Sequence, residues 1–261
     1  MEPYSILTST HKETILALQK AALAAVEPGA AVRRHVQRQG EHLVIGGRAH
    51  DLSDVVRVLV VGGGKAAVAM TSALSGILGA RLTGGLVVTK YEHVDPSLDT
   101  GPVEVVEAGQ PRPDGSGVVG ARSLVALLSE TTECDLVLAV LSGGGSALMT
   151  LPADGLSLAD LQVATNLLLQ SGATIVELNA LRKHLSKLKG GGMARLASPT
   201  PVASLVLSDV VGDPLDAIAS GPLSPDSTTF ADAWAVLERY DLQDRIPTAV
   251  QQRLRAGLEG I

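Results

Sequence analysis

The chain has 261 residues, of which 46% are hydrophobic and only 2% aromatic, and its formal net charge is −6 at pH 7. This length suits one large α/β domain or two small ones, and a core of Ala, Val, Leu and Ile is typical of a parallel sheet buried on both faces. The negative charge argues against a nucleic-acid partner, and no apolar run approaches the roughly 18–20 residues of a membrane span. Cys134 is the single cysteine, so we expect an inert core residue and a reducing compartment. With no signal-peptide pattern at its start, the sequence predicts a cytoplasmic protein with neither a nucleic-acid nor a membrane partner.

Helical patterns alternate with short apolar runs along the chain. The first two predicted helices cover about 9–26 and the region of Arg33 and Arg34, and they are separated by the Pro28-Gly29 pair. The predicted strands are 55–61, 85–89, 103–107, 136–141 and 202–207. The later predicted helices are 66–78, 115–128, 157–170, 174–189, 228–242 and 248–258. This order predicts an α/β fold with a doubly wound, mostly parallel sheet, a Rossmann-like three-layer sandwich, whose ligands bind beyond the carboxyl ends of the strands.

The first predicted strand ends in a glycine-rich segment that contains a lysine. Gly62, Gly64 and Ala67 match the dinucleotide fingerprint GxGxxG/A, but only Glu92 stands near where the ribose-binding acid belongs. The segment is not a Walker A loop, because its spacing differs and an alanine follows Lys65. A cation in the first turn of a helix opposes the helix dipole, which favours a functional role for Lys65.

The fourth and fifth predicted strands also end in residues suited to ligand binding. Ser142 and Ser146 flank the run Gly143-Gly144-Gly145, whose backbone amides could form an anion-binding nest or only a flexible connection. Asp209 directly follows the last strand, where its carboxylate could bind magnesium or orient a hydroxyl. Asp213 could have a functional role of the same kind, or it could equally be the N-cap of a helix that begins at Pro214.

The predicted helix 174–189 carries two adjacent stripes. Its buried face comprises Leu178, Leu181, Leu185 and Leu188, and its polar stripe comprises Asn179, Arg182, Ser186 and Lys189. The polar stripe would line a cleft wall or be ordinary surface charge, whereas Lys183 and Lys187 are predicted to be solvated. The glycines at 190–192 are expected to end the helix.

Together these segments resemble the glycerate 2-kinase family, whose C-terminal half is known as the MOFRL domain. The matching segments, spanning roughly 60–225, are GGGKAAVAM, the Pro113-Asp114 turn in AGQPRPDG, LSGGGSALM, SGATIVELNALRKHLSKLKGGGMA and LSDVVGDPLDAIASGP. The chain departs from the family at Gln110, where histidine is usual, and at Glu92, where glycine is usual. We expect neither departure to touch the cleft.

The resemblance implies an ATP- and magnesium-dependent (Mg2+) kinase that converts D-glycerate to 2-phosphoglycerate, with Lys65 as its catalytic lysine. It implies nucleotide binding by two glycine loops and substrate binding by the helix and the last strand end. The nucleotide-binding residues are Gly63, Gly64, Ser142, Gly143, Gly144, Gly145 and Ser146. The substrate-binding residues would be Asn179, Arg182, Lys189 and Asp209. The candidate magnesium ligands are Asp209, which could instead contact the substrate hydroxyl, and Asp213.

The resemblance also implies a domain organisation. Residues 5–242 would form the N-terminal Rossmann-like domain and residues 243–261 would begin an inter-domain helical region. Family members usually continue into a second α/β domain of the MOFRL type, which supplies a catalytic arginine, so we expect this chain to be inactive alone and to need that domain as its partner. A homodimer is compatible with the resemblance. Two alternatives remain: an NAD(P)H-dependent hydroxypyruvate reductase, and a non-catalytic ligand-binding module.

Overall fold

The computed structural model describes residues 11–261, and its centre is a five-stranded parallel sheet with the order β6-β5-β4-β7-β8. The strands are β4 (Arg57–Gly63), β5 (Leu82–Lys90), β6 (Glu104–Ala108), β7 (Asp135–Ser142) and β8 (Val202–Leu207). The chain builds from β4 outward to β6 and then crosses to the other side to form β7 and β8. This order is the predicted doubly wound sheet, and it places the topological switch point between β4 and β7.

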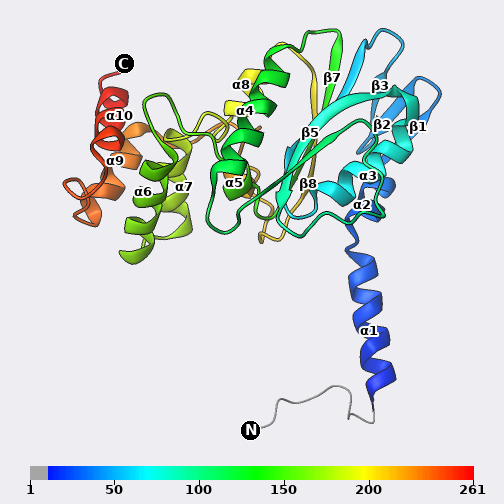
Figure 1. Cartoon of the computed structure of the whole chain (residues 1–261), viewed down its shortest axis with the longest axis horizontal. Helices are drawn as coiled ribbons and strands as arrows, with labels where there is room; N and C mark the ends of the chain where they lie inside the picture. The colour runs from blue at the N-terminus through cyan, green and yellow to red at the C-terminus, as the bar shows by residue number, and fades with distance from the viewer. Residues whose placement is uncertain (1–10) are drawn as a thin grey trace.

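Helices cover both faces of the sheet (Figure 1). One face packs against α2 (Pro28–His35) and α3 (Ala67–Leu78), and the other against α4 (Gly115–Ser129) and α8 (Gly192–Ala197). Strand β7 alternates between the two layers: Leu136, Leu138 and Val140 join the α3 side, and the residues between them join the α4 side. The three-layer sandwich predicted from the apolar runs is therefore confirmed.

A lobe of four helices lies beside the sandwich (Figure 1). It comprises α6 (Leu158–Gln170), α7 (Ile175–His184), α9 (Phe230–Arg239) and α10 (Thr248–Leu258), which bury one apolar cluster. Helices α6, α7 and α9 each begin with a capping box, in which a Ser or Thr and the acid three residues later satisfy each other's backbone amides. The domain boundary proposed at 242/243 falls inside this cluster, between Leu242 and Ile246, and remains a prediction.

The N-terminal helix α1 (Lys12–Ala25) extends away from the body (Figure 1), and none of its residues is buried. The predicted start of this helix at residue 9 lies outside the described residues. Within residues 11–261 no single helix is long and apolar enough to cross a membrane. Helices α1 and α2 reach that length and apolar composition only when they are counted as one, and they are bent by 45° relative to each other.

Three short strands follow α2 where we predicted no element. They are β1 (Val36–Gln39), β2 (His42–Ile45) and β3 (Arg48–Asp51), and they form an antiparallel sheet. The turn between β2 and β3 is Gly46-Gly47, with φ values of 55° and 84°. A two-residue turn with positive φ at both positions is the usual hairpin connection.

Helix α7 ends at His184 rather than at Lys189, so the prediction of one helix over 174–189 is wrong. The chain beyond it pairs with an earlier segment: the Leu185 carbonyl accepts from the Ala153 amide at 2.9 Å, and the Lys187 amide donates to the Leu151 carbonyl at 3.0 Å. This pairing replaces the last helical turn. Nor do the glycines at 190–192 end α7; Gly191 is the N-cap of α8.

Lys183 was also predicted wrongly as solvated. It is 6% exposed, and its ammonium lies 3.2 Å from Asp226 and 3.6 Å from Asp216. Both acids come from the segment after β8, far away in sequence. The ion pairs attach that segment to α7.

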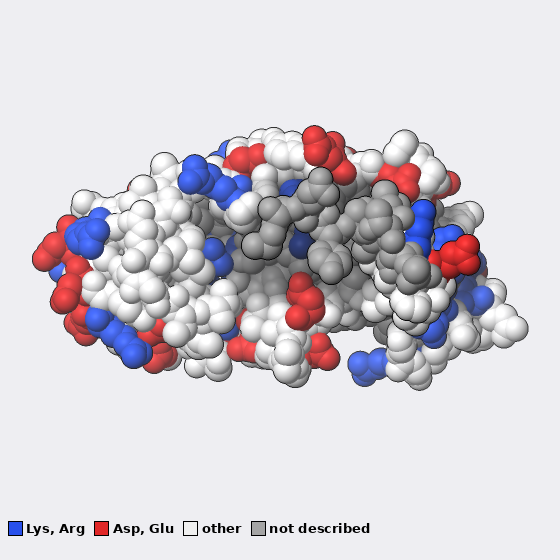
Figure 2. Space-filling view, turned by 90° about the horizontal axis from the view of Figure 1, so that it is seen from below, with Lys and Arg blue, Asp and Glu red and all other residues white. Residues whose placement is uncertain are grey.

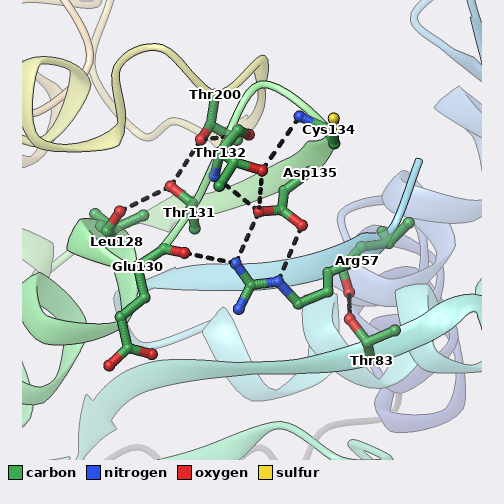
Figure 3. A network of polar contacts seen from close by, with 10 residues as sticks. Arg57, Thr83, Leu128, Glu130, Thr131, Thr132, Cys134, Asp135 and Thr200 are labelled. Atoms are coloured by element: carbon green, nitrogen blue, oxygen red, sulfur yellow. Dashed lines mark hydrogen bonds and ion pairs between the residues drawn. The ribbon is translucent and has the colours of Figure 1, made fainter. Parts of the chain in front are cut away.

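The amino-terminal edge of the sheet holds a polar network (Figure 3). Arg57 at the start of β4 makes a two-pronged contact with Asp135 at the start of β7, at 2.9 and 2.7 Å, and also donates to the Glu130 carbonyl. The Arg57 guanidinium lowers the pKa of Asp135 to about 2. Cys134, which we expected in the core, is exposed because it lies in the turn before β7. This network is at the opposite end of the strands from the loops described next.

Candidate functional site

The loop after β4 (residues 64–66, the first glycine loop) and the loop after β7 (residues 143–145, the second glycine loop) meet at the switch point. Hydrogen bonds connect them. The Lys65 amide donates to the Gly143 carbonyl at 2.9 Å, and the Ala66 amide donates to Ser142 Oγ at 3.0 Å. These two bonds place Lys65 beside the second glycine loop. Figure 2 looks onto this side of the molecule, where the surface is hollowed between the helical lobe and the sheet and carries both cationic and acidic side chains around the hollow.

The first glycine loop has a packing role. The Gly64 amide donates to the Val88 carbonyl at 3.0 Å, so the amides of Gly64, Lys65 and Ala66 are all bonded within the protein. A Cβ on Gly64 would lie 2.1 Å from Ser142 Oγ, and the φ of Gly64 is 141°. Glycine is therefore required for the two loops to touch. A dinucleotide fingerprint needs amides free to face a pyrophosphate, and these are not.

Lys65 and Asp209 both lie against the second loop. A Cβ built on Gly143 would lie 3.3 Å from Asp209 Oδ2 and 3.7 Å from Lys65 Cε, so both side chains lie against this glycine. Both residues are exposed. The three strand ends identified from the sequence thus converge, because the carboxyl ends of parallel strands share one edge of the sheet.

The second glycine loop contains two unbonded backbone amides, one at the half-buried Gly144 and one at the buried Gly145. Gly144 is left-handed, with φ 90°, and leads into the one-turn helix α5 (Gly145–Leu148). Within residues 11–261 the amides of Gly144 and Gly145 have no hydrogen-bond acceptor. A Cβ on Gly144 would lie 3.4 Å from Gln110 Cγ, so Gln110 lies against this loop. Our expectation that the Gln110 departure lies away from the cleft is therefore wrong.

Ser220 supports the second glycine loop from inside the protein. It is 1% exposed and belongs to the short 3-10 helix η3 (Ile218–Ser220). Its hydroxyl lies 2.9 Å from Ser146 Oγ and donates to Asn179 Oδ1 at 3.1 Å. Asn179 is itself buried, so its carbonyl oxygen supports this chain of contacts. The φ of 62° at Ser220 is the unusual feature that the sequence did not indicate.

Two cations line a small cavity of about 40 Å³ behind the second loop. Lys189 is 5% exposed, and its ammonium donates to the Ser146 carbonyl at 2.8 Å. Burial, with the nearby charge of Arg182, lowers the pKa of Lys189 to about 7. Arg182 is half-buried and makes no hydrogen bond or ion pair in the described part of the chain. Arg182, Ser186 and Lys189 thus share one cavity although α7 ends before two of them.

Asp213 does not cap a helix. No helix begins at Pro214, so the N-cap interpretation is wrong; Asp213 is an exposed turn residue with φ 47°. Over residues 11–261 no group of three or more His, Cys, Asp or Glu side chains could hold a metal ion by itself. Asp209 is the carboxylate that lies against the glycine loop.

The chain is similar to several named or structurally solved proteins. The D-glycerate 2-kinase of Thermotoga maritima is 48% identical over 187 residues, covering 72% of this chain and 44% of the relative. A putative hydroxypyruvate reductase of Agrobacterium vitis is 44% identical over 201 residues, covering 77% of this chain and 51% of the relative. A crystal structure of a Pyrococcus horikoshii protein aligns with a TM-score of 0.87 at 40% identity, covering 97% of this chain and 56% of that one.

The chain therefore spans about half the length of the curated relatives it matches. A family model described as "Domain of unknown function (DUF4147)" matches residues 14–255. The resemblance to the glycerate 2-kinases is confirmed by these matches. The chain belongs to the DUF4147 family.

Proposed function

We propose that this chain provides the phosphate-binding part of an ATP- and magnesium-dependent kinase that phosphorylates D-glycerate at its 2-hydroxyl. The observation that carries the proposal is that Lys65 and Asp209 lie against Gly143, next to the amides of Gly144 and Gly145, which have no acceptor within residues 11–261. A cation, a carboxylate and amide donors around one glycine loop are the groups that phosphoryl transfer uses.

Lys65 is the proposed catalytic residue. Phosphoryl transfer depends on positioning and on neutralising charge that spreads over the oxygens of the transferred group. The bond from the Lys65 amide to the Gly143 carbonyl fixes the backbone from which this side chain extends. The amides of the second loop would hold the nucleotide phosphates, while Gly63, Gly64 and Ser142 keep the two loops together.

Asp209 is the proposed magnesium ligand. Magnesium in kinase sites is held by one or two carboxylates together with phosphate oxygens and water, so a single carboxylate beside the glycine loop fits it. When bound, the ion would neutralise phosphate charge. Asp213, in the same segment, is a second candidate ligand.

The substrate side of the site is proposed to be the side of the second loop on which Arg182 lies. Arg182 is the proposed contact with D-glycerate, because its charge has no protein partner within residues 11–261. Lys189 and Asn179 face the protein more than the cavity, through Ser146 and Ser220. We therefore propose that they support substrate binding by holding the loop in place.

The remaining half of the relatives' length is proposed to complete the site. A kinase must exclude water and surround the transferring group with charge, which is usually achieved by closing a second domain. We propose that residues 5–242 act with a C-terminal domain of the kind the relatives carry, and that the 261-residue chain alone has no kinase activity.

A hydroxypyruvate reductase is the second candidate, favoured by the name of the Agrobacterium vitis relative. It is disfavoured by the first glycine loop, whose amides are bonded to the protein. The deciding experiment fuses this chain to the C-terminal half of the Thermotoga maritima kinase and compares two assays. ADP formed from D-glycerate, ATP and magnesium supports the kinase, whereas NADH consumed with hydroxypyruvate supports the reductase.

A further inference from the structure

A second cavity opens beside the first, between α6, α7 and the segment that follows β6. Its volume is about 270 Å³, which is ample for a molecule of a few heavy atoms. It is lined by Pro111, Arg112, Pro113, Gln162, Thr165, Asn166, Leu169 and Arg182. Nothing in the site described so far uses Arg112, Gln162 or Asn166.

The polar lining of this outer cavity is cationic. It contains two arginines, two amides and a hydroxyl, and none of its lining residues is an acid. Burial lowers the pKa of the Arg182 guanidinium from its usual range, and no side chain in the described chain pairs with it. A partly buried charge without a partner is costly to the folded protein, so a site of this kind favours an anion.

The outer cavity shares part of its wall with the inner cavity. Pro113, Thr165 and Arg182 line both it and the inner cavity that Ser146 and Lys189 line. Arg182 therefore stands between the glycine loop and the outer cavity.

The wall formed by residues 110–113 is held in place at two points. The Gln162 side-chain amide donates to the Pro113 carbonyl at 2.7 Å, which leaves its oxygen able to accept from a hydroxyl. Gln110 lies against Gly144, so the segment rests on the second glycine loop. A molecule in the outer cavity would thus be held at a fixed position relative to that loop.

We propose that the outer cavity binds a small 2-hydroxycarboxylate, with Arg112 and Arg182 contacting its carboxylate and Gln162 and Asn166 contacting its hydroxyls. The proposal rests on the proposed function for the identity of the ligand, D-glycerate. An arginine guanidinium matches a carboxylate with two parallel hydrogen bonds, and side-chain amides supply both donors and acceptors for hydroxyls. A carboxylate is favoured over a phosphate here, because the loop with free amides already provides a phosphate site.

The test is to measure the binding of D-glycerate to the 261-residue chain by saturation-transfer NMR or calorimetry. Glycerol, which keeps the hydroxyls but lacks the carboxylate, should bind at least 10-fold more weakly. Arg112→Ala and Arg182→Ala should each weaken D-glycerate binding by about 10- to 100-fold, the effect of losing a hydrogen bond to a charged group. Arg245→Ala, which removes an exposed arginine away from the cavity, is the matched control and should bind normally.

Asn166→Asp is the most discriminating variant, because it changes an exposed amide to an acid of nearly the same shape. It should weaken D-glycerate binding through repulsion of the carboxylate while leaving the melting temperature unchanged. Inorganic phosphate should fail to displace D-glycerate from the wild-type chain. Displacement by phosphate, equal binding of glycerol, or unchanged binding in both arginine variants would overturn the proposal.

The outcome is separable from that of the proposed function. D-glycerate binding that depends on Arg112 and Arg182 supports the cavity assignment even if MgATP does not bind at Lys65 and the kinase proposal fails. Normal MgATP binding without any D-glycerate binding would overturn the cavity assignment and leave the phosphate site intact.

Discussion

The amide of Lys65 and the carbonyl of Gly143 are joined by a 2.9 Å hydrogen bond across the switch point of the sheet. The bond connects two residues 78 positions apart in the sequence, one bearing the candidate catalytic cation and the other beginning the loop with free amides. The position of Lys65 therefore depends on how closely the two loops pack. The following predictions test that dependence and the supporting structure around it.

Substituting Gly64 with alanine should destabilise the protein and displace Lys65. The new Cβ would meet Ser142 Oγ at 2.1 Å in a backbone conformation with φ 141°, so we expect the free energy of unfolding to fall by at least ~2 kcal/mol. Gly76→Ala is the control, because this exposed glycine inside α3 has nothing within 4 Å of a built Cβ. It should stabilise by ~0.4–1 kcal/mol. Urea unfolding of both variants gives the comparison, and a Gly64→Ala protein as stable as wild type would contradict it.

Substitutions of Leu185 and Lys187, both in the segment after α7, should differ in their effect on the free energy of unfolding. Leu185 is 2% exposed, so Leu185→Ala should cost ~2–5 kcal/mol, as other core truncations do. Lys187 forms an exposed ion pair with Asp154, and Lys187→Ala should change the free energy of unfolding by less than ~1 kcal/mol. Equal losses in the two variants, measured by chemical denaturation, would mean that this segment is not packed as described.

Asp135 should make stability depend on pH in the acid range. Its pKa in the folded protein is about 2, below the ordinary value of 3.8. The ionised carboxylate therefore stabilises the fold above about pH 4, and that contribution, on the order of 2 kcal/mol, is lost as the pH falls from about 4 to about 2. In acid titrations of unfolding, Asp135→Asn should lack this part of the pH dependence. Asp244→Asn, at an exposed site, should retain it.

Lys189 should take up a proton when an anion binds beside it. Its folded pKa of about 7 lies below the ordinary 10.5, so its charge destabilises the fold at low pH and this cost is relieved as the pH rises from about 7 to about 10. An anion in the inner cavity should restore the charge. Sulfate titrated at pH 8 in buffers of different ionisation enthalpy should show uptake of up to about one proton, which should disappear at pH 6 and in Lys189→Met. No uptake by the wild-type chain at pH 8 would contradict this.

The parts of the fold that the sequence predicted correctly are those set by local patterns. Continuous apolar runs indicated the parallel strands, and their order with the helices implied the shared edge where Lys65, Gly143 and Asp209 meet. Glu92 adopts a φ of 63°, a backbone conformation that glycine adopts without steric cost.

The parts that could not be predicted depend on contacts between distant segments. The leucine spacing continues through Leu188, and only pairing with residues 151–153 ends α7 at His184. Lys183 lies on the face that spacing assigned to solvent, yet it is buried and forms ion pairs with acids from beyond β8. The two adjacent glycines Gly46 and Gly47 are typical of a hairpin turn. The strands beside them have only four residues each, too few to show an alternating pattern in the sequence.

The most direct test of the central claim, that nucleotide phosphates bind at the switch point, is an NMR titration of the 15N-labelled chain with MgATP. The account predicts weak binding in which the Gly144 and Gly145 amide signals shift most, because these amides are free donors. It also predicts that Lys65→Ala raises the dissociation constant at least 10-fold, while Lys20→Ala, on the exposed face of α1, leaves it unchanged. Shifts confined to other parts of the chain, or equal affinity for MgATP in wild type and Lys65→Ala, would contradict it.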